Sequence, residues 1–432
     1  MINLEVPKKF GFLIGQAHQV AAEVMRPNSR KYDRAEHTYP KELDMLAAVI
    51  NGMNESGALS GAGAGGATRG SSENGASKNG ATGDGSSGDG SSGDGSGDRA
   101  SGDGASTRNG SNLASVLSVA EVCWGDVGLL LTMPGQGLGN AAIAAVANDE
   151  QLHRFGGKWA AMAITEPEAG SDSAAIRTTA TLDGDEYVLN GEKIFVTSGD
   201  RAELIVVWAS LDRDQGRAAI KSFVVERNNP GLKLDRLEHK LGIRASDTAN
   251  FVLSDCRVPK ENLLGSPEIQ PKQGFAGVMQ TFDNTRPLVA AMALGVARAC
   301  LEETRKRLEE VGTRIDYDAP PNSQSAAAAE FVAMEADYEA ARLLTLQAAW
   351  MADNGKPNSL QASMAKAKAG RTGTDIALRC VALCGAAGYG EGELLEKWAR
   401  DAKILDIFEG TQQIQLLVVA RLLLGRSSSE LK

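Results

Sequence analysis

The hydrophobic pattern of this 432-residue chain changes its period twice, and the order of these changes limits the folds that the chain can adopt. Up to about Ala160, apolar residues recur at the spacing of α-helices. The pattern then changes to the alternation that is typical of β-strands, and from Gly274 the helical spacing returns. We therefore expect an α+β protein with three domains: an N-terminal helical domain (1–158), a central antiparallel β domain (159–271) and a C-terminal helix bundle (272–432).

The central domain contains short strand patterns that are separated by turn residues. Asp183-Gly184 and Asn190-Gly191 both predict tight hairpin turns. A glycine-rich stretch at 135–139 follows a helical pattern rather than a strand, so we do not expect a dinucleotide-binding Rossmann fold. The expected strands are 161–165, 178–182, 187–189, 193–197, 204–209, 221–226 and 250–253.

A long segment, 55–112, interrupts the first helical part and differs from it in composition. Of its 58 residues 18 are glycine, and Leu59 is its only large apolar side chain. Such a segment cannot bury enough apolar surface to offset its chain entropy, so we expect a disordered insertion between two helices. Its Gly-Asp repeats lack the periodic apolar residue or the closing glutamate that calcium-binding repeats require.

The composition narrows the possible classes of function. A net charge of −10 makes a surface for nucleic acids or anionic membranes unexpected. The longest uncharged stretch, 127–148, contains Pro134 and several glycines at its centre, so we expect no membrane span. Five scattered cysteines and the lack of a signal-peptide pattern are typical of a reducing, cytoplasmic location, and with only four histidines we expect no metal site.

A carboxylate near the C-terminus, Glu409, stands between a bulky apolar residue and a glycine, directly before a helical pattern. Its neighbours Ile407 and Phe408 favour a raised pKa of its carboxyl group through desolvation, and the step from Gly410 to Thr411 lets backbone N–H groups face a ligand. Such a carboxylate is suited to act as a general base on a weak carbon acid. The plainer alternative is a solvated glutamate in the first turn of a helix.

Two segments of the central domain offer groups that suit a planar, phosphorylated ligand. The segment 164–172 carries the hydroxyl groups of Thr165 and Ser171 beside a glycine that lets backbone N–H groups approach a ligand. In the second segment, Phe195 and Thr197 are expected on the same face of one strand, where a ring and a hydroxyl group can cover a cofactor. An ordinary turn and ordinary core packing are the alternatives.

Five ordered motifs of the chain resemble those of the acyl-CoA dehydrogenases, a family of flavoenzymes. The motifs are Ile164-Thr-Glu-Pro-Glu-Ala-Gly-Ser-Asp172, Asn190-Gly-Glu-Lys-Ile-Phe-Val-Thr197, Phe282-Asp-Asn-Thr-Arg-Pro287, Arg400-Asp-Ala-Lys403 and Ile407-Phe-Glu-Gly-Thr411. The resemblance covers nearly all of the chain except the segment 55–112. It implies N-terminal helices, a central β domain, a C-terminal four-helix bundle, a tightly bound FAD and the oxidation of an acyl-CoA thioester to its trans-2-enoyl product.

The resemblance also implies a role for each matching residue. Glu409 is expected to remove the α-proton, its own N–H group is expected to help hold the thioester carbonyl, and the β-hydride is expected to pass to flavin N5. Contacts with FAD are implied for Ile164, Thr165, Ser171, Phe195, Thr197, Gly385, Thr411 and Gln413. Contacts with the substrate are expected for Met133, Gln136, Asp283, Arg286, Phe408 and Gly410.

The resemblance further implies an electron-transfer flavoprotein as acceptor, a place in fatty-acid β-oxidation, and a homodimer or homotetramer in which FAD also touches a neighbouring subunit. Two positions depart from the family pattern. An Arg-x-x-Phe-Gly element is absent, with Arg314 as its candidate substitute, and a usual Gly-Gly pair is replaced by Gly385-Ala386. Two alternatives stay open: an acyl-CoA oxidase that uses oxygen, and a non-enzymatic flavin-binding scaffold. The sequence does not fix the length of the acyl chain.

Overall fold

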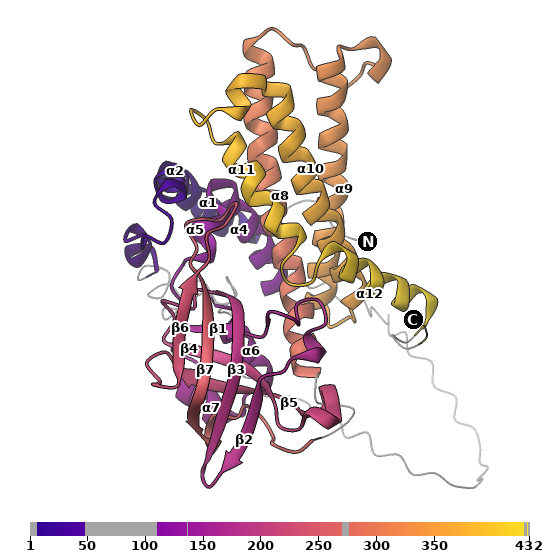
Figure 1. The fold of residues 1–432 in the computed structure, drawn as a ribbon. Coiled ribbons are helices and arrows are strands. Elements are labelled where there is room, and N and C mark those ends of the chain that lie inside the picture. Colours follow the sequence, from indigo (N-terminus) through magenta and orange to yellow (C-terminus); the bar gives the residue numbers. More distant parts are fainter. Residues whose placement is uncertain (1–6, 48–109, 136, 270–275, 427–429, 431–432) are drawn as a thin grey trace, which may run out of the picture.

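The computed structural model describes residues 7–47, 110–135, 137–269, 276–426 and 430, and for 276–284 it describes the backbone only. Most of the insertion predicted at 55–112 lies outside the described residues. Figure 1 shows the β-sheet in the lower half of the molecule, with the long C-terminal helices rising above it and beside it. The predicted order of helices, sheet and helix bundle is confirmed.

The N-terminal part is helical, as predicted. Its elements are α1 (Gly11–Val20), a π-helical turn (Ala21–Met25), α2 (Arg26–Arg34), α4 (Ser111–Gly125), α5 (Val127–Leu131), α6 (Leu138–Val146) and α7 (Asp149–Phe155), and residues 42–47 are also helical. Helix α4 packs against the C-terminal bundle, while α6 packs against the first strand of the sheet. The N-terminal helices therefore connect the sheet to the bundle.

The predicted end of the insertion needs a correction, because Ser111 and Asn112 already belong to α4. The carboxylate of Asp353, at the end of a bundle helix, accepts hydrogen bonds from the backbone N–H groups of Gly110 (2.9 Å), Asn112 (2.9 Å) and Leu113 (3.0 Å). A carboxylate placed there satisfies N–H groups that the first helical turn leaves without partners. A distant acceptor thus fixes the start of α4, and local composition gives no sign of it.

The central sheet has seven strands in the order β1-β4-β2-β3-β7-β6, with β5 paired to β4. They are β1 (Ala160–Ala163), β2 (Thr179–Asp183), β3 (Glu186–Thr197), β4 (Leu204–Ser210), β5 (Ile220–Glu226), β6 (Leu232–Leu237) and β7 (Thr248–Pro259). Most pairs are antiparallel, as predicted, but β1 runs parallel to β4 and β2 meets β4 in a short parallel contact. Between β1 and β4 the chain forms the β2–β3 hairpin. Strand β2 has the same direction as β4 and β3 runs back, so β4 has the direction of β1 again.

One of the two predicted hairpins is present and the other is not. Asp183-Gly184 turns the chain from β2 into β3, and Gly184 has a left-handed φ of 63°. The hairpin predicted at Asn190-Gly191 is wrong, because β3 continues through these residues with a bulge in its pairing to β7. Gly191 has a φ of 155°, and a Cβ atom there would lie 2.4 Å from the hydroxyl of Thr178. The glycine therefore serves a close packing contact rather than a turn.

The C-terminal bundle is built on three long helices, α8 (Ala276–Glu310), α9 (Ala326–Asp353) and α10 (Ser359–Tyr389). Helix α11 (Leu395–Ala402) packs against α8 and α10, and a 3₁₀ turn (Lys403–Asp406) leads to α12 (Gln412–Leu424). In Figure 1, α12 extends away from the lower part of the bundle. Small side chains dominate the facing surfaces of the long helices, including Ala290, Ala341 and Ala369, so the helix axes can approach closely.

A buried ionic group joins the three parts of the molecule, and we call it the anchor cluster: Ser29, Asp126, Lys397 and Asp401. The ammonium group of Lys397 donates to Asp126 Oδ2 (2.6 Å) and to Asp401, and the hydroxyl of Ser29 also donates to Asp126. The N–H group of Ile243, in the loop before β7, donates to Asp401 Oδ1 (2.6 Å). The anchor cluster therefore ties α2, the start of α5, this loop and α11 together.

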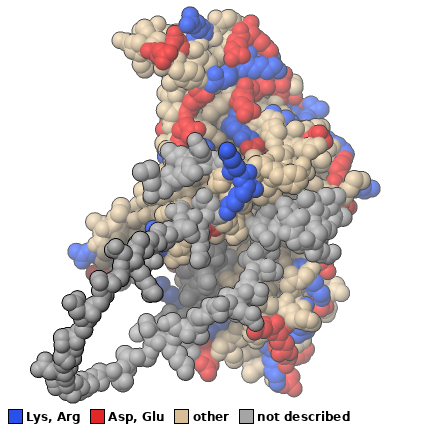
Figure 2. Space-filling model, turned by 180° about the vertical axis from the view of Figure 1, so that it is seen from behind, with Lys and Arg blue, Asp and Glu red and all other residues tan. Residues whose placement is uncertain are grey.

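The surface carries charges of both signs. On the face shown in Figure 2, acidic and basic side chains are interspersed over the upper part of the bundle. Among the residues that the structure describes, no helix is both long and apolar enough to cross a membrane.

Candidate active site

The segment around Glu409 forms a strained turn between the 3₁₀ turn 403–406 and α12. Glu409 has a φ of 52° and Gly410 a φ of 87°, so two successive residues are left-handed. Such a conformation is unfavourable for a glutamate, and the surroundings must hold it in place. The side chain of Gln415 donates to the carbonyl groups of Glu409 (3.1 Å) and Gly410 (3.3 Å), and Thr411 caps α12 by accepting from the N–H group of Ile414 (3.3 Å).

The carboxyl group of Glu409 is placed like a reactive group rather than a solvated charge. Its Oε2 atom is buried and has no hydrogen-bond partner among the described residues, although part of the residue remains exposed. Burial raises the pKa of Glu409, while a hydrogen bond from Thr285 and the charges of Lys366 and Arg286 act in the opposite direction. The alternative of a solvated glutamate in a helix is thus not what the structure shows.

Three buried residues surround this carboxyl group, and we call them, with Glu409, the base site: Thr285, Arg286, Lys366 and Glu409. Thr285 and Arg286 lie on α8, and a terminal nitrogen of Arg286 is 3.4 Å from the hydroxyl of Ser363. Lys366 lies on α10 and donates from Nζ to the carbonyl oxygen of Gly410 (2.6 Å). Sequence reasoning named Arg286 but missed Thr285 and Lys366.

The two segments predicted to hold the cofactor lie side by side in the sheet. The N–H group of Ile194 donates to the carbonyl of Thr165 (2.9 Å). Beside this bond, the buried ammonium group of Lys193 donates to Glu166 Oε1 (2.7 Å), which also accepts from the N–H group (3.0 Å) and the hydroxyl of Thr178. Burial lowers the pKa of Lys193 to about 8, against the effect of Glu166. The ion pair between Glu166 and Lys193 fixes one segment on the other and was not predicted.

The predicted cofactor residues of these segments differ in exposure. Ile164 is buried, Thr165 and Thr197 are half-buried, and Ser171 is exposed. Phe195 is 58% exposed, has a φ of 57° and lies where the pairing of β3 with β7 is irregular. Since Val196 between Phe195 and Thr197 is buried, both predicted residues stay out of the core. A large exposed ring beside hydroxyl groups is suited to cover a ligand.

The end of β3 and helix α11, which leads to Glu409, both contact one loop, residues 243–247. After Thr197, the N–H group of Ser198 donates to the carbonyl of Asp247 (3.1 Å). At the other end of the loop, Ile243 is bound to Asp401 on α11, which leads directly to Glu409. The loop thus connects the end of β3, through a backbone hydrogen bond, to α11, through the carboxylate of Asp401, and α11 precedes the segment of Glu409.

The remaining predicted residues are found in several settings. Met133 is buried, and Phe408 packs against the bundle core. Gly385 interrupts α10 with a φ of 55° and a ψ of −131°. Gln413 is exposed, whereas its neighbour Gln415 is fully buried and supports the turn. Gln136 lies outside the described residues, and of Asp283 only the backbone, in α8, is described.

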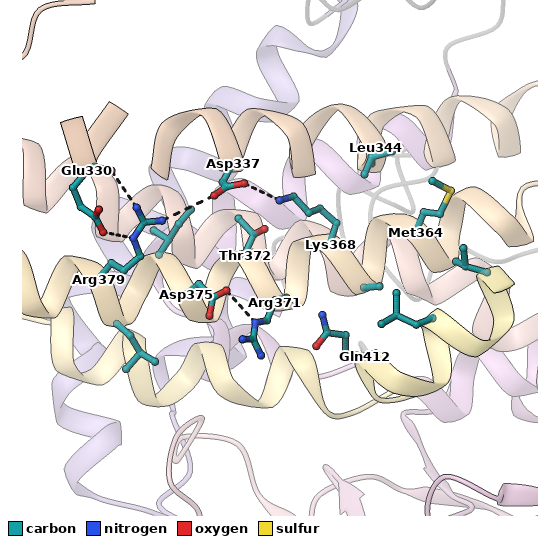
Figure 3. A pocket seen from close by; sticks show the side chains of 15 residues that line it. Glu330, Asp337, Leu344, Met364, Lys368, Arg371, Thr372, Asp375, Arg379 and Gln412 are labelled. Carbon is teal, nitrogen blue, oxygen red and sulfur yellow. Dashed lines mark hydrogen bonds and ion pairs between the residues drawn. The ribbon is translucent and has the colours of Figure 1, made fainter. Parts of the chain in front are cut away.

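A cavity of about 800 Å³ lies elsewhere, between α9, α10 and α12 (Figure 3). Its charged walls pair with one another, as in Lys368–Asp337 (2.8 Å) and Arg371–Asp375 (3.0 Å). Among the described residues that line it, none was predicted to bind cofactor or substrate. Paired charges leave this cavity without an obvious group to recognise a ligand, so we place the candidate site at Glu409.

One group of side chains in the described part of the chain has the spacing of metal ligands: Glu36, His37 and His239 lie with ligand atoms within 4.8 Å of one another. The carboxylate of Glu36 already accepts from the N–H group of Lys240 (2.9 Å), and Arg244 is 3.2 Å from it. A cation there would meet positive charge, so we assign no metal to this group. The lack of a metal site stays a prediction.

The fold and the base site together define a class of protein: N-terminal helices, a central sheet and a helix bundle, with a carboxylate in the bundle whose Oε2 atom is buried and which is suited to general-base catalysis. Comparison with known families agrees with this class. The acyl-CoA dehydrogenase middle domain matches residues 161–256, and the acyl-CoA dehydrogenase C-terminal domain matches residues 272–424. The short-chain specific acyl-CoA dehydrogenase of Clostridium acetobutylicum is 35% identical over 316 residues, which are 72% of this chain and 81% of that protein. The chain belongs to the acyl-CoA dehydrogenase family.

Other relatives agree with this assignment. The mitochondrial short-chain specific acyl-CoA dehydrogenase of Rattus norvegicus is 42% identical over 265 residues, which are 61% of this chain and 63% of that protein. The chain thus matches less than two thirds of the length of this relative. Among solved structures, the butyryl-CoA dehydrogenase of Megasphaera elsdenii is 28% identical with a TM-score of 0.77, and the match covers 98% of this chain and 100% of that one.

Proposed function

We propose that this protein is an FAD-dependent acyl-CoA dehydrogenase that converts an acyl-CoA thioester to its trans-2-enoyl product. The observation that carries the proposal is Glu409, a carboxylate on a left-handed turn with one buried oxygen that no described residue satisfies. A carbon acid that enters this position meets a base with a raised pKa, which accepts a proton more readily than a solvated carboxylate does. FAD, when bound, supplies the acceptor for the β-hydride.

The backbone of the same residue supports a second role. The N–H groups of Ile407 and Phe408 both donate to the carbonyl of Ile404, whereas within the described residues no such backbone bond is recorded from the N–H group of Glu409. We infer that this N–H group donates to the thioester carbonyl while the carboxylate of Glu409 takes the α-proton. A donor fixed in this way stabilises the negative charge that develops on the carbonyl oxygen.

The chain's residues fit a flavin. The exposed ring of Phe195, the exposed hydroxyl of Ser171 and the half-buried hydroxyls of Thr165 and Thr197 offer a planar contact and hydrogen-bonding groups. We propose that these residues and Ile164 hold FAD, with Gly385, Thr411 and Gln413 at its other end. Arg314 is 87% exposed and 3.3 Å from Asp316, and its proposed role at the FAD of a partner subunit requires a second copy of the chain.

The names of the relatives favour a short acyl chain, and we propose butyryl-CoA as the first substrate to test. We also propose that Met133, Gln136, Asp283, Arg286, Phe408 and Gly410 line the substrate site. An electron-transfer flavoprotein is the proposed acceptor, in the cytoplasm. Five exposed leucines on α12, from Leu416 to Leu424, support a homodimer or homotetramer in which this helix is covered.

The experiment that tests the proposal is anaerobic reduction of the bound flavin by butyryl-CoA. Glu409→Gln is expected to keep the yellow flavin and to slow bleaching by about 10²- to 10⁴-fold, because the amide cannot accept the α-proton. Glu391→Gln is the matched control, since Glu391 is 61% exposed and pairs with Arg34 at the surface. Normal bleaching of Glu409→Gln would remove Glu409 from its proposed role.

The same preparation separates the alternatives. An oxidase would consume oxygen and release peroxide after reduction, whereas the proposed dehydrogenase passes its electrons to a flavoprotein. Protein that is folded but contains no flavin would contradict the proposed function and favour a scaffold.

A further inference from the structure

Lys366 differs from the other fully buried lysines of the described chain. Lys193 forms an ion pair with Glu166, and Lys397 forms ion pairs with two aspartates. Lys366 is 1% exposed, yet within the described residues no carboxylate lies within ion-pair distance of it, and its Nζ donates to the carbonyl oxygen of Gly410 (2.6 Å). A buried ammonium group that is held by a backbone carbonyl is costly, so its position requires an explanation.

The contact with Gly410 bears directly on the geometry of the proposed base. Glu409 and Gly410 are both left-handed, and their carbonyl groups are held by Gln415 and Lys366. The direction of the Glu409 side chain follows from this backbone conformation. If the hydrogen bonds from Gln415 and Lys366 were lost, the turn would relax toward a less strained conformation. The carboxylate of Glu409 would then move away from its position.

The charge of Lys366 also acts on Glu409. The groups that face the carboxyl of Glu409 are Thr285 and Arg286 from α8 and Lys366 from α10, and Asp406 acts on Lys366 from the preceding 3₁₀ turn. Burial lowers the pKa of Lys366 to about 8, against the effects of Glu409 and Asp406, so at neutral pH the group is mostly charged. Its positive charge favours the carboxylate form of Glu409.

We propose that Lys366 is a positioning residue for the reaction: it holds the carbonyl of Gly410, and with it the turn that directs Glu409, and its charge favours the form of Glu409 that can accept a proton. This inference rests on the proposed function, because it needs Glu409 as the base. Lys366 itself exchanges no proton with the substrate.

The test is the pH profile of flavin reduction by butyryl-CoA, measured by anaerobic stopped-flow between pH 5.5 and 9 on the flavin-loaded full chain. Lys366→Met is expected to slow reduction by about 10- to 100-fold and to move the acid limb of the profile to higher pH, because the neutral side chain no longer favours the carboxylate. Lys366→Arg keeps the charge, so its acid limb is expected to remain near that of the unchanged protein.

Two further variants separate charge from geometry. Gln415→Leu removes the other side chain that holds the turn but no charge, so it is expected to slow reduction without moving the acid limb. Lys368→Met is the matched control on the same helix, because Lys368 is partly exposed and pairs with Asp337 at 2.8 Å. It is expected to change neither the rate nor the profile.

The outcomes distinguish this inference from the proposed function. If butyryl-CoA and longer acyl-CoA thioesters all fail to bleach the unchanged protein, the proposed function fails. If the unchanged protein is bleached and Glu409→Gln is not, but Lys366→Met keeps the acid limb, Lys366 has only a structural role and the inference is wrong. Should Lys366→Met contain no flavin, Lys366→Gln and Lys366→Arg carry the test, and equal acid limbs in this neutral and charged pair would likewise overturn it.

Discussion

The anchor cluster and the base site both bury charged side chains between helices, but they differ in how far those charges are satisfied. In the anchor cluster, all four carboxylate oxygens of Asp126 and Asp401 accept a hydrogen bond from a donor. In the base site, Oε2 of Glu409 has no partner among the described residues, and Lys366 is held by a carbonyl. A complete network stabilises an arrangement, whereas an incomplete one leaves a group that can react.

The difference also appears in the pKa values. Burial alone would lower the pKa of Lys397, but Asp126 and Asp401 outweigh burial and raise it. For Lys366 burial prevails and lowers the pKa to about 8, and for Glu409 burial raises the pKa. Lys397 in the anchor cluster thus stays charged at neutral pH, while burial moves the pKa values of Lys366 and Glu409 in the base site toward neutrality.

The largest effect on the folded protein is expected at the anchor cluster. Lys397→Met leaves two buried carboxylates without their shared cation, and we expect the free energy of unfolding to fall by about 3–5 kcal/mol. Thermal unfolding followed by circular dichroism measures the loss, with Lys368→Met as the surface control. Flavin reduction by the molecules that remain folded should keep its acid limb, because Lys397 belongs to the anchor cluster and not to the base site. A melting temperature within about 2 °C of the unchanged protein would show that the cluster is not an anchor.

The next effect is expected at the turn of the base. In Gly410→Ala, the new Cβ atom would lie 2.4 Å from Nε2 of Gln415, at a φ of 87° that side chains rarely adopt. We expect flavin reduction to slow by about 100-fold, because a small displacement of the base is enough to spoil its geometry. Stopped-flow bleaching measures the rate.

Gly392→Ala is the matched control for this change, since a Cβ atom at Gly392 meets nothing within 4 Å. An unchanged rate in Gly410→Ala, with flavin bound, would mean that the left-handed turn does not direct Glu409. The anchor cluster and the base site would then differ only in how their charges are satisfied.

The sequence predicted the long helices and most of the sheet, because their hydrophobic periods are regular over many residues, but it missed β6, whose side chains are mostly exposed and show no such period. It failed where a distant contact decides the local structure. Asn190-Gly191 has the composition of a hairpin, but the approach of Thr178 turns it into a bulge. Ser111 and Asn112 read as part of the insertion, but Asp353 fixes them in α4.

The unusual setting of Glu409 was predictable from the sequence, while the residues that support its turn were not. Glu409 stands out because an apolar residue and a glycine flank it in the sequence. Lys366 stands in a helical pattern rich in alanine and lysine, where the sequence does not tell a buried lysine from its partly exposed neighbour Lys368. Within 365–370, small residues surround Lys366 at helical spacing, which is typical of a closely packed helix face. The sequence does not show that this face of α10 packs against the turn at Gly410.

The smallest of the expected effects tests whether hydrogen bonding tunes the base site. The hydroxyl of Thr285 donates to Glu409 and opposes the rise in its pKa, so Thr285→Val should raise the pKa of Glu409 further. Since the carboxylate is the active form, the acid limb of flavin reduction should move to higher pH. We expect reduction to slow by about tenfold at pH 6 and by much less at pH 8.5, where the carboxylate forms in both proteins.

Thr345→Val is the matched control, because Thr345 is equally buried in the bundle but donates its hydroxyl to Ala341 on its own helix (2.9 Å). It removes the same atoms without touching the base. An equal loss of rate at both pH values in Thr285→Val would mean that Thr285 only packs against Glu409. Thr285 would then belong with residues such as those of the anchor cluster, which hold the structure without setting the protonation of the base.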